Sequence, residues 1–213
     1  MNYAVIIAAG GSGTRMGLPY NKLFYPLKDG RTILEHTIKI FIDDQRCQQI
    51  IIATNADDLS RMVNMNTGRV VLVNGGQTRQ ESVYKGLMAA NEEVVLIHDG
   101  ARPWLPKPCL DRLLEVMTIE DAAILALKAI ETVKVCEDGY VTQTIPRESV
   151  MMAQTPQAFK TEILIKAHHM AMIDVYQATD DAQLIEHYKL AKIKIVEGDV
   201  LNVKITTLHD VPK

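Results

Sequence analysis

The chain has 213 residues, of which 47% are hydrophobic, and its 23 basic and 26 acidic side chains give a formal net charge of −3. This balance predicts one large globular domain, 1–213, and argues against intrinsic disorder and against a nucleic-acid partner, which a basic patch would normally mark. The three cysteines lack metal-site or redox spacing and no stretch approaches the roughly 18 apolar residues of a membrane span, so we expect a cytoplasmic protein with no membrane partner.

Short apolar runs rich in β-branched residues recur along the chain and are predicted to be strands. They lie at 3–8, 49–54, 69–73, 94–97 and 122–127. Because these runs are almost wholly apolar rather than alternating, they suit a sheet that is covered on both faces.

Helix-start signals lie between these runs. Thr32 followed by Glu35, and Thr78 followed by Glu81, both give the capping-box pattern ahead of an amphipathic segment. Strands that alternate with helices predict an α/β fold, here a three-layer Rossmann-like domain with a mostly parallel central sheet. Ligands are then expected beyond the carboxyl ends of the strands.

One later segment, at about 131–147, breaks the alternation of strands and helices. Its two β-rich runs, 132–136 and 140–145, flank Glu137-Asp138-Gly139. An Asp-Gly pair between such runs is typical of a β-hairpin. A hairpin inserted into an α/β domain is expected to project as an arm, and a partner subunit is one candidate to bury it.

A glycine-rich segment, Ala-Ala-Gly-Gly-Ser-Gly-Thr-Arg-Met-Gly at 8–17, directly follows the first predicted strand. Glycines let successive backbone N–H groups converge on an anion without interference from a Cβ atom. The segment is not a P-loop, because Arg15 or Met16 stands where the second glycine belongs. It is not a dinucleotide fingerprint either, because Met16 stands at the third glycine.

The segment resembles instead the loop of the sugar and polyol phosphate nucleotidyltransferases, which is followed by a lysine in a short loop, here Lys22. In such a loop Arg15 and Lys22 would bring two positive charges to the same triphosphate. The alternative is a glycine-rich turn with two exposed cations.

Two later strand ends carry further signals. Gly75 and Gly76 lead into a capped helix, where backbone groups could read a base edge, although a plain turn is an equally good interpretation. Asp99 ends the fourth run within His-Asp-Gly-Ala-Arg-Pro at 98–103. A carboxylate there suits Mg²⁺, which takes one or two protein carboxylates with phosphates and waters. The alternative is that Asp99 accepts local backbone hydrogen bonds and pairs with Arg102.

Together these segments resemble the 2-C-methyl-D-erythritol 4-phosphate cytidylyltransferase family, from the N-terminal loop almost to the last residue. The resemblance is carried by six blocks in the same order, at 8–16, 75–82, 98–103, 154–157, 179–182 and 197–206. It implies transfer of CMP from CTP to 2-C-methyl-D-erythritol 4-phosphate with release of pyrophosphate, in isoprenoid precursor biosynthesis.

The resemblance also implies roles for individual residues. The triphosphate would be held by Ala8, Ala9, Gly10, Gly13, Arg15 and Lys22. Cytosine and ribose would be faced by Gly76, Gln77 and Ser82, and Asp99 would lie by the ribose and by Mg²⁺ or another divalent cation. The acceptor would be lined by Arg102, Thr155, Thr179 and Lys204. The catalytic set would be Arg15, Lys22 and Lys204.

In the family, two further residues reach the acceptor pocket from the other subunit of a homodimer, on or beside the arm. They correspond to Thr132 and Arg147. The chain also departs from the family pattern, which usually has Pro-Lys where Asn21-Lys22 stands and often has Asp in place of Gln77. Members normally begin a further helix at about 209–213.

Two alternative functions remain open at this point. One is the same chemistry on ribitol 5-phosphate, although those relatives tend to start Leu-Ala-Gly-Gly and to carry His-Asp-x-Val-Arg, unlike Ala8-Ala9 and Gly100-Ala101-Arg102 here. The other is a non-catalytic nucleotide-binding regulator on the same fold. A pure binder has less need of a full set of charges, and this chain retains Arg15, Lys22, Asp99 and Lys204 together.

Overall fold

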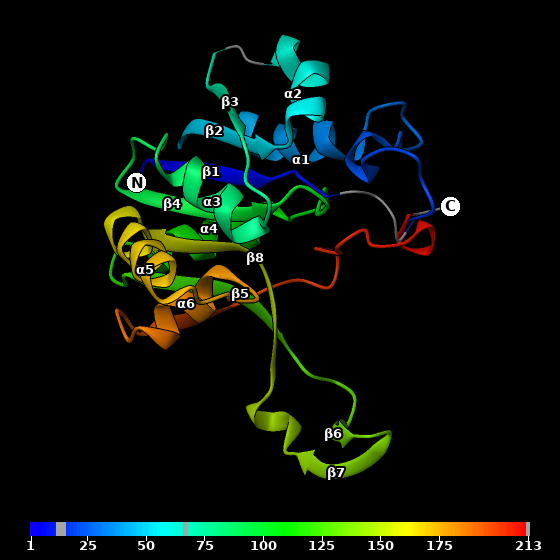
Figure 1. Ribbon diagram of the computed structural model, residues 1–213, viewed down its shortest axis with the longest axis vertical. Coiled ribbons are helices and arrows are strands. Elements are labelled where there is room, and N and C mark those ends of the chain that lie inside the picture. Colours follow the sequence, from blue (N-terminus) through cyan, green and yellow to red (C-terminus); the bar gives the residue numbers. More distant parts are fainter. Residues whose placement is uncertain (12–15, 66–67, 212–213) are drawn as a thin grey trace.

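A seven-stranded sheet runs through the molecule in the order β3-β2-β1-β4-β8-β5-β9 (Figure 1). It is seen in a computed structural model that describes residues 1–11, 16–65 and 68–211. The strands are β1 (Tyr3–Ala8), β2 (Cys47–Thr54), β3 (Val70–Asn74), β4 (Val94–Asp99), β5 (Ala122–Lys128), β8 (Met151–Lys160) and β9 (Ile193–Glu197). The predicted strands are all present as β1 to β5, with ends within two residues of those expected.

The sheet is mostly parallel, as the sequence predicts. Strands β1, β2, β3 and β4 pair in parallel, and so do β5 and β9. The exception is β8, which lies antiparallel between β4 and β5 and was not predicted. It contains Pro156, and proline within a sheet is normally confined to edges and bulges. Here the register shifts between Ile124 and Ala126 of β5, opposite the segment that contains this proline.

Helices cover both faces of the sheet and complete the predicted three layers. Buried side chains of α1 (Ile33–Ile42) and α4 (Lys107–Val116) form one core with Val5 and Ile7, while α3 (Arg79–Leu87), α5 (Thr161–Asp174) and α6 (Asp181–His187) form the other with Ile6. Successive residues of a strand point to opposite faces, so the apolar runs fill both cores. No helix in the described ranges is long and apolar enough to cross a membrane.

The first predicted helix start is a complete capping box. Thr32 Oγ1 accepts a hydrogen bond from Glu35 N at 3.2 Å, and Glu35 Oε2 accepts one from Thr32 N at 2.6 Å. The second is only half formed. Thr78 Oγ1 accepts from Glu81 N at 3.1 Å, but Glu81 Oε2 accepts from Gln77 N at 2.8 Å and so fixes the loop before the helix.

Replacing Thr32 with alanine is expected to lower the free energy of unfolding by about 1 kcal/mol, because the hydroxyl that accepts from Glu35 N and donates to Glu35 Oε2 is lost. Urea unfolding followed by circular dichroism measures this change. Ser60→Ala, which removes an exposed hydroxyl that donates to Asp57 O within α2 (Ala56–Met62), is the control. Equal stability of Thr32→Ala and wild type would contradict the capping role.

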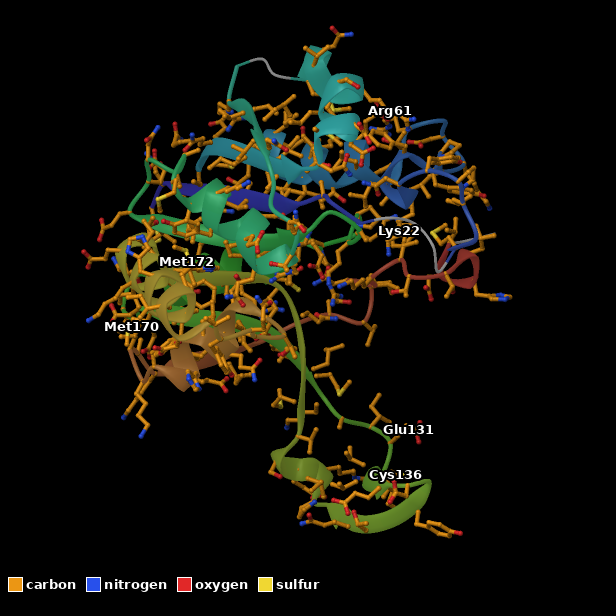
Figure 2. The ribbon with its side chains drawn as sticks, viewed as in Figure 1. Lys22, Arg61, Glu131, Cys136, Met170 and Met172 are labelled. Carbon is orange, nitrogen blue, oxygen red and sulfur yellow. The ribbon has the colours of Figure 1, made fainter. Side chains whose placement is uncertain are left out.

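The predicted hairpin is present and projects from the body (Figures 1 and 2). It consists of β6 (Val133–Glu137) and β7 (Tyr140–Ile145), paired antiparallel. The turn residues Asp138 and Gly139 have φ of 49° and 84°, the positive values that a type I′ hairpin turn requires. Figure 2 shows Glu131 and Cys136 on this arm, well away from the helices that cover the sheet.

Candidate active site

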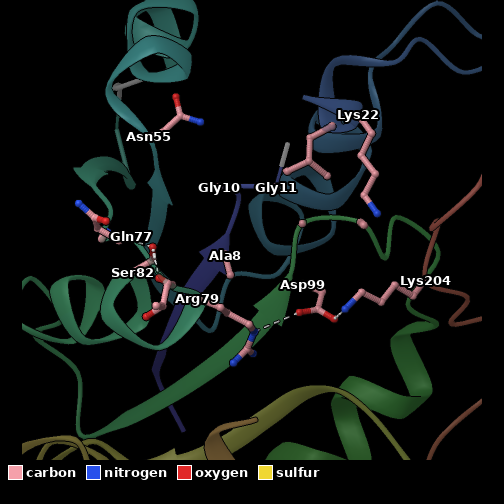
Figure 3. A pocket seen from close by; sticks show the side chains of 15 residues that line it. Ala8, Gly10, Gly11, Lys22, Asn55, Gln77, Arg79, Ser82, Asp99 and Lys204 are labelled. Carbon is pink, nitrogen blue, oxygen red and sulfur yellow. Dashed lines mark hydrogen bonds and ion pairs between the residues drawn. The ribbon is translucent and has the colours of Figure 1, made fainter. Parts of the chain in front are cut away.

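A pocket of about 300 Å³ opens at the carboxyl ends of β1 and β4, where an α/β sheet is expected to bind its ligand. Figure 3 shows Lys22, Asp99 and Lys204 along one side of it and Asn55, Gln77 and Ser82 along the other. The pocket brings together eight residues predicted from the sequence: Ala8, Gly10, Lys22, Gly76, Gln77, Ser82, Asp99 and Lys204.

Asp99, the last residue of β4, is the electrostatic centre of the pocket. Its carboxylate lies 2.8 Å from Lys204 Nζ, 3.6 Å from Arg79 Nε and 3.7 Å from Arg102 Nε. Burial alone would raise the pKa of Asp99, but the positive charges of Lys204 and Arg79 outweigh it and lower the pKa to about 2. Asp99 is therefore ionised at neutral pH.

The two predicted lysines are linked through one residue of the C-terminal segment. Lys22 is 7% exposed, and its Nζ donates to Ile205 O at 2.6 Å. Ile205 N in turn donates to Ala101 O at 2.9 Å, next to Asp99. Ile205 thereby holds the neighbouring Lys204 beside the pocket. It also brings Lys204 close to Lys22, which is far away in the sequence.

The loop after β3 lines the pocket and is hydrogen-bonded to the start of α3. Gly76 N donates to Ser82 Oγ at 3.0 Å, and Ser82 Oγ donates to Thr78 O at 2.9 Å. A Cβ atom on Gly75 would lie 2.7 Å from Ser82 Oγ, which is too close. The glycines are thus required by the close approach of the loop to α3, and the hydroxyl of Ser82 fixes that loop.

The strand position behind Asp99 is fixed by a hydrogen-bonded chain. Asp99 N donates to Thr155 Oγ1 at 3.0 Å, and Thr155 Oγ1 lies 3.1 Å from His98 Nδ1. His98 Nε2 lies 3.2 Å from Arg102 O, and because a carbonyl oxygen can only accept, the proton of His98 is assigned to Nε2. The Thr155 hydroxyl then donates to Nδ1. Arg102 Nη1 donates to Asn202 O at 2.6 Å, so Arg102 ties the C-terminal segment to Asp99.

His98 makes the stability of the fold depend on pH. It is fully buried, and this burial lowers its pKa from 6.5 to about 4, although Asp99 partly opposes the shift. Between these values the unfolded chain binds the proton and the folded chain does not, so stability falls as pH drops. From pH 7.5 to pH 5 we expect His98 to contribute a loss of about 2 kcal/mol.

Urea unfolding at the two pH values, for wild type and His98→Gln, measures this contribution. The substitution should make the free energy of unfolding less sensitive to pH by that amount, whatever its effect at pH 7.5. The same pH dependence in both proteins would contradict the assignment.

The other predicted residues lie in several places. Ala9 is buried beside the pocket, where its N–H donates to Ala53 O at 2.8 Å. Thr179 is exposed just before α6 and donates through its N–H to Gln183 Oε1 at 2.6 Å. Thr132 and Arg147 are exposed on or beside the arm. Gly13 and Arg15 lie outside the described residues, so their roles stay predictions.

Asn55 and Arg79 are among the pocket residues that had been given no role in the sequence interpretation. Asn55 stands at the end of β2 and caps α2 (Ala56–Met62). Arg79, the first residue of α3, connects Asp99 to the buried Asp181, whose Oδ2 accepts from Arg79 Nη1 at 2.7 Å. Arg79 belongs to the block at 75–82, and its place three residues after the paired glycines was the available signal.

The residues of the pocket fit one divalent cation held together with a phosphate ligand. Asp99 is the one carboxylate among the lining residues that the structure describes, and no group of three or more His, Cys, Asp or Glu gathers there as a complete metal site. Mg²⁺ needs only one or two protein carboxylates when substrate phosphates supply the other oxygens. Asp99 would therefore hold it.

A glycine-lined pocket at parallel strand ends, with two lysines and a carboxylate around it, defines the class: an α/β nucleotidyltransferase-type domain. The family model of 2-C-methyl-D-erythritol 4-phosphate cytidylyltransferase matches residues 3–213. The chain belongs to this family.

Individual relatives agree over nearly the whole length. The enzymes of that name from Bacillus pumilus and Geobacillus kaustophilus are 40% and 41% identical, each covering 99% of this chain and 94% of the relative. The solved structure of the Francisella tularensis enzyme has a TM-score of 0.86 at 34% identity and covers 99% of this chain and 97% of its own. That of 4-diphosphocytidyl-2C-methyl-D-erythritol synthase from Anaerococcus prevotii has a TM-score of 0.87 at 31% identity, covering 99% and 94%.

Proposed function

We propose that this chain transfers CMP from CTP to 2-C-methyl-D-erythritol 4-phosphate, giving 4-diphosphocytidyl-2-C-methyl-D-erythritol and pyrophosphate, in isoprenoid precursor synthesis. The observation that supports this most strongly is the convergence of the predicted residues on one pocket. Lys22, Asp99 and Lys204 come from three separate segments and lie around the same cavity. Family membership over residues 3–213 supports the choice of substrates.

The nucleotide would lie across the strand ends. Ala8, Ala9, Gly10 and Lys22 would hold the triphosphate, with Gly13 and Arg15 completing the loop, while Gly76, Gln77 and Ser82 would face the cytidine. Backbone N–H groups of a glycine-rich loop suit phosphate oxygens, and the buried stem of Lys22 restricts the positions that its ammonium group can reach. Gln77 is exposed and lines the pocket, and its backbone N–H donates to Glu81. Its side chain is not used in that bond and would face the cytidine.

The reaction is a single displacement. An oxygen of the acceptor phosphate attacks the α-phosphorus of CTP, and the bond from that phosphorus to the pyrophosphate oxygen breaks. Lys204, which is 41% exposed at its side chain, would hold the attacking phosphate, while Lys22 and Arg15 stabilise the charge that develops on the transferred group. Arg102, Thr155 and Thr179 complete the acceptor side, with Thr155 acting through the backbone of Asp99.

A divalent cation bound by Asp99 would neutralise charge on the triphosphate oxygens. We propose Mg²⁺, or another divalent cation of similar ligand preference. The positive charges of Lys204 and Arg79 keep the carboxylate in the ionised form that a cation requires.

The proposal is tested by pyrophosphate release from CTP and MgCl₂, with 2-C-methyl-D-erythritol 4-phosphate and ribitol 5-phosphate as alternative acceptors. We expect release with the first and a kcat/KM for the second that is at least about 100-fold lower, as is usual when a polar site is left mismatched. Faster reaction with ribitol 5-phosphate would mean that ribitol 5-phosphate is the acceptor. No release with either would favour a nucleotide-binding regulator.

Exposed apolar side chains on the arm support the proposal that the protein is a homodimer. Its large apolar side chains are exposed, with Tyr140 at 78% and Val141 at 63%. A two-stranded hairpin is marginally stable in water by itself, so a second subunit would stabilise it. Residues 131–147 would then form a dimerisation arm of the single domain 1–213 and bring Thr132 and Arg147 to the partner's acceptor pocket.

Arg147→Ala is expected to raise the KM for the acceptor by roughly 10-fold or more, because a charge-assisted hydrogen bond to its phosphate is lost. The KM for CTP should stay the same, and the mass in solution should remain that of the dimer. Lys134→Ala, which removes another exposed cation of the arm, is the control. Unchanged acceptor KM and kcat in Arg147→Ala would count against a site shared between subunits.

A further inference from the structure

Asn21 stands directly before Lys22, and its side chain is buried, with 5% exposed. Its Nδ2 donates to Ala9 O and to Asp58 Oδ2, both at 2.7 Å, and its Oδ1 accepts from Leu23 N at 3.1 Å. An amide has two N–H donors and a carbonyl acceptor, and all of these groups are used here. The orientation of the amide follows, because Leu23 N can only donate.

The carboxylate of Asp58 connects Asn21 to the rim of the pocket. Asp58 is 6% exposed, and the same Oδ2 atom also accepts from Asn55 Nδ2 at 2.8 Å. Asn55 lines the pocket and caps α2, since its Oδ1 accepts from Asp58 N at 2.8 Å. We call Asn21, Asp58 and Asn55 the asparagine clasp. It joins the loop of Lys22 to the segment that follows β2.

The contact of Asn21 with Ala9 also orients the glycine-rich loop. Ala9 O accepts from Asn21 Nδ2 and, at 3.2 Å, from Thr54 Oγ1. The peptide bond is planar and trans, so a fixed Ala9 carbonyl fixes the direction of the next N–H, that of Gly10. Gly10 lines the pocket. A single side chain therefore sets both a backbone donor and the start of the segment that carries Lys22.

We infer that Asn21 is a positioning residue for the transfer reaction: through the asparagine clasp it holds Lys22 and the Gly10 amide in one arrangement around the triphosphate. The inference rests on the proposed function, because it assigns these two groups to CTP. No other uncharged side chain of similar size supplies two donors and an acceptor at this position, so alanine there opens the clasp at three bonds.

A double-mutant cycle separates positioning from a general effect on folding. Wild type, Asn21→Ala, Lys22→Met and the double variant are compared for kcat with CTP, MgCl₂ and 2-C-methyl-D-erythritol 4-phosphate. Asn21→Ala is expected to lower kcat by roughly 10- to 100-fold, as a small misplacement of a catalytic group does. In the Lys22→Met background the fold-loss should be clearly smaller, because only the Gly10 amide is then left for Asn21 to position.

Two variants of α2 complete the design. Asp58→Ala opens the clasp from the other side and should lower kcat in the same direction, which also provides the test if Asn21→Ala does not fold. Asp57→Ala removes the neighbouring exposed carboxylate of the same helix turn and should leave kcat unchanged. Thermal melts show that each protein is folded at the assay temperature.

Near-wild-type kcat in Asn21→Ala, or the same fold-loss in both Lys22 backgrounds, would overturn the inference. Calorimetric titration of the same four proteins with CTP and MgCl₂ measures the binding of CTP without turnover, so the inference can be tested even if the proposed reaction is wrong. If wild type makes no product with either acceptor, the proposed function fails. If Asn21→Ala weakens the binding of CTP more when Lys22 is present than in the Lys22→Met background, positioning is still supported. Equal weakening in both backgrounds would refute it.

Discussion

Replacing Lys22 with methionine is expected to lower kcat by about 10³-fold, with little loss of folded protein. Methionine keeps most of the apolar stem, so the buried path of the side chain remains filled. What is lost is the charge that stabilises the transferring phosphoryl group, together with the hydrogen bond from Nζ to Ile205 O. Steady-state kinetics with saturating CTP and acceptor measure the change.

Two comparisons show whether this effect is specific. Lys160→Met removes a lysine that is paired with Glu93 at 2.7 Å on another part of the surface, and its kcat should match that of wild type. Circular dichroism and a thermal melt of Lys22→Met establish that the fold persists. Turnover of Lys22→Met close to that of wild type would remove Lys22 from the catalytic set.

Asp99→Asn is expected to lower kcat by roughly 10²- to 10³-fold and to raise the concentration of MgCl₂ needed for half-maximal rate. The amide keeps the size of the side chain but loses the charge that holds Lys204 at 2.8 Å and Arg79 at 3.6 Å. It also removes the carboxylate proposed to bind the cation. Kinetics over a series of MgCl₂ concentrations separate the two consequences.

Asp111→Asn is the matched control for this substitution, because Asp111 pairs with Arg46 and Lys107 away from the pocket. It should leave the dependence on MgCl₂ unchanged. Since the pKa of Asp99 lies at about 2, wild type should show no loss of rate from protonation of this group down to pH 5. An Asp99→Asn protein with normal rate and normal MgCl₂ dependence would exclude Asp99 as the metal ligand.

Strands β1 to β5 could be predicted because each can be recognised from its own local sequence pattern. Strands β1 to β5 are apolar runs that fill the two cores on either side of the sheet, so composition and length were sufficient to find them. Strand β8 was missed because it contains polar residues and Pro156, which interrupt the apolar run expected of a buried strand. Pro156 is accommodated where the register against β5 shifts.

The site residues that lie at or just after the end of a strand could be predicted from the sequence. Asp99 and Gly76 stand at or just after the ends of β4 and β3, and the glycine-rich segment follows β1. Other features depend on contacts between distant residues and carry no local signal. Lys22 meets Ile205, Arg79 meets Asp181, and Asn21 meets Asp58 only in the folded chain.

Isotope transfer tests the central claim, direct transfer of CMP to the acceptor phosphate, most directly. Wild-type protein is incubated with CTP, MgCl₂ and 2-C-methyl-D-erythritol 4-phosphate carrying ¹⁸O in its non-bridging phosphate oxygens, and both products are analysed by mass spectrometry. Attack by the acceptor phosphate on the α-phosphorus predicts that all of the label appears in the diphosphate of the cytidyl product and none in the released pyrophosphate. Labelled pyrophosphate, or no cytidyl product, would contradict this account.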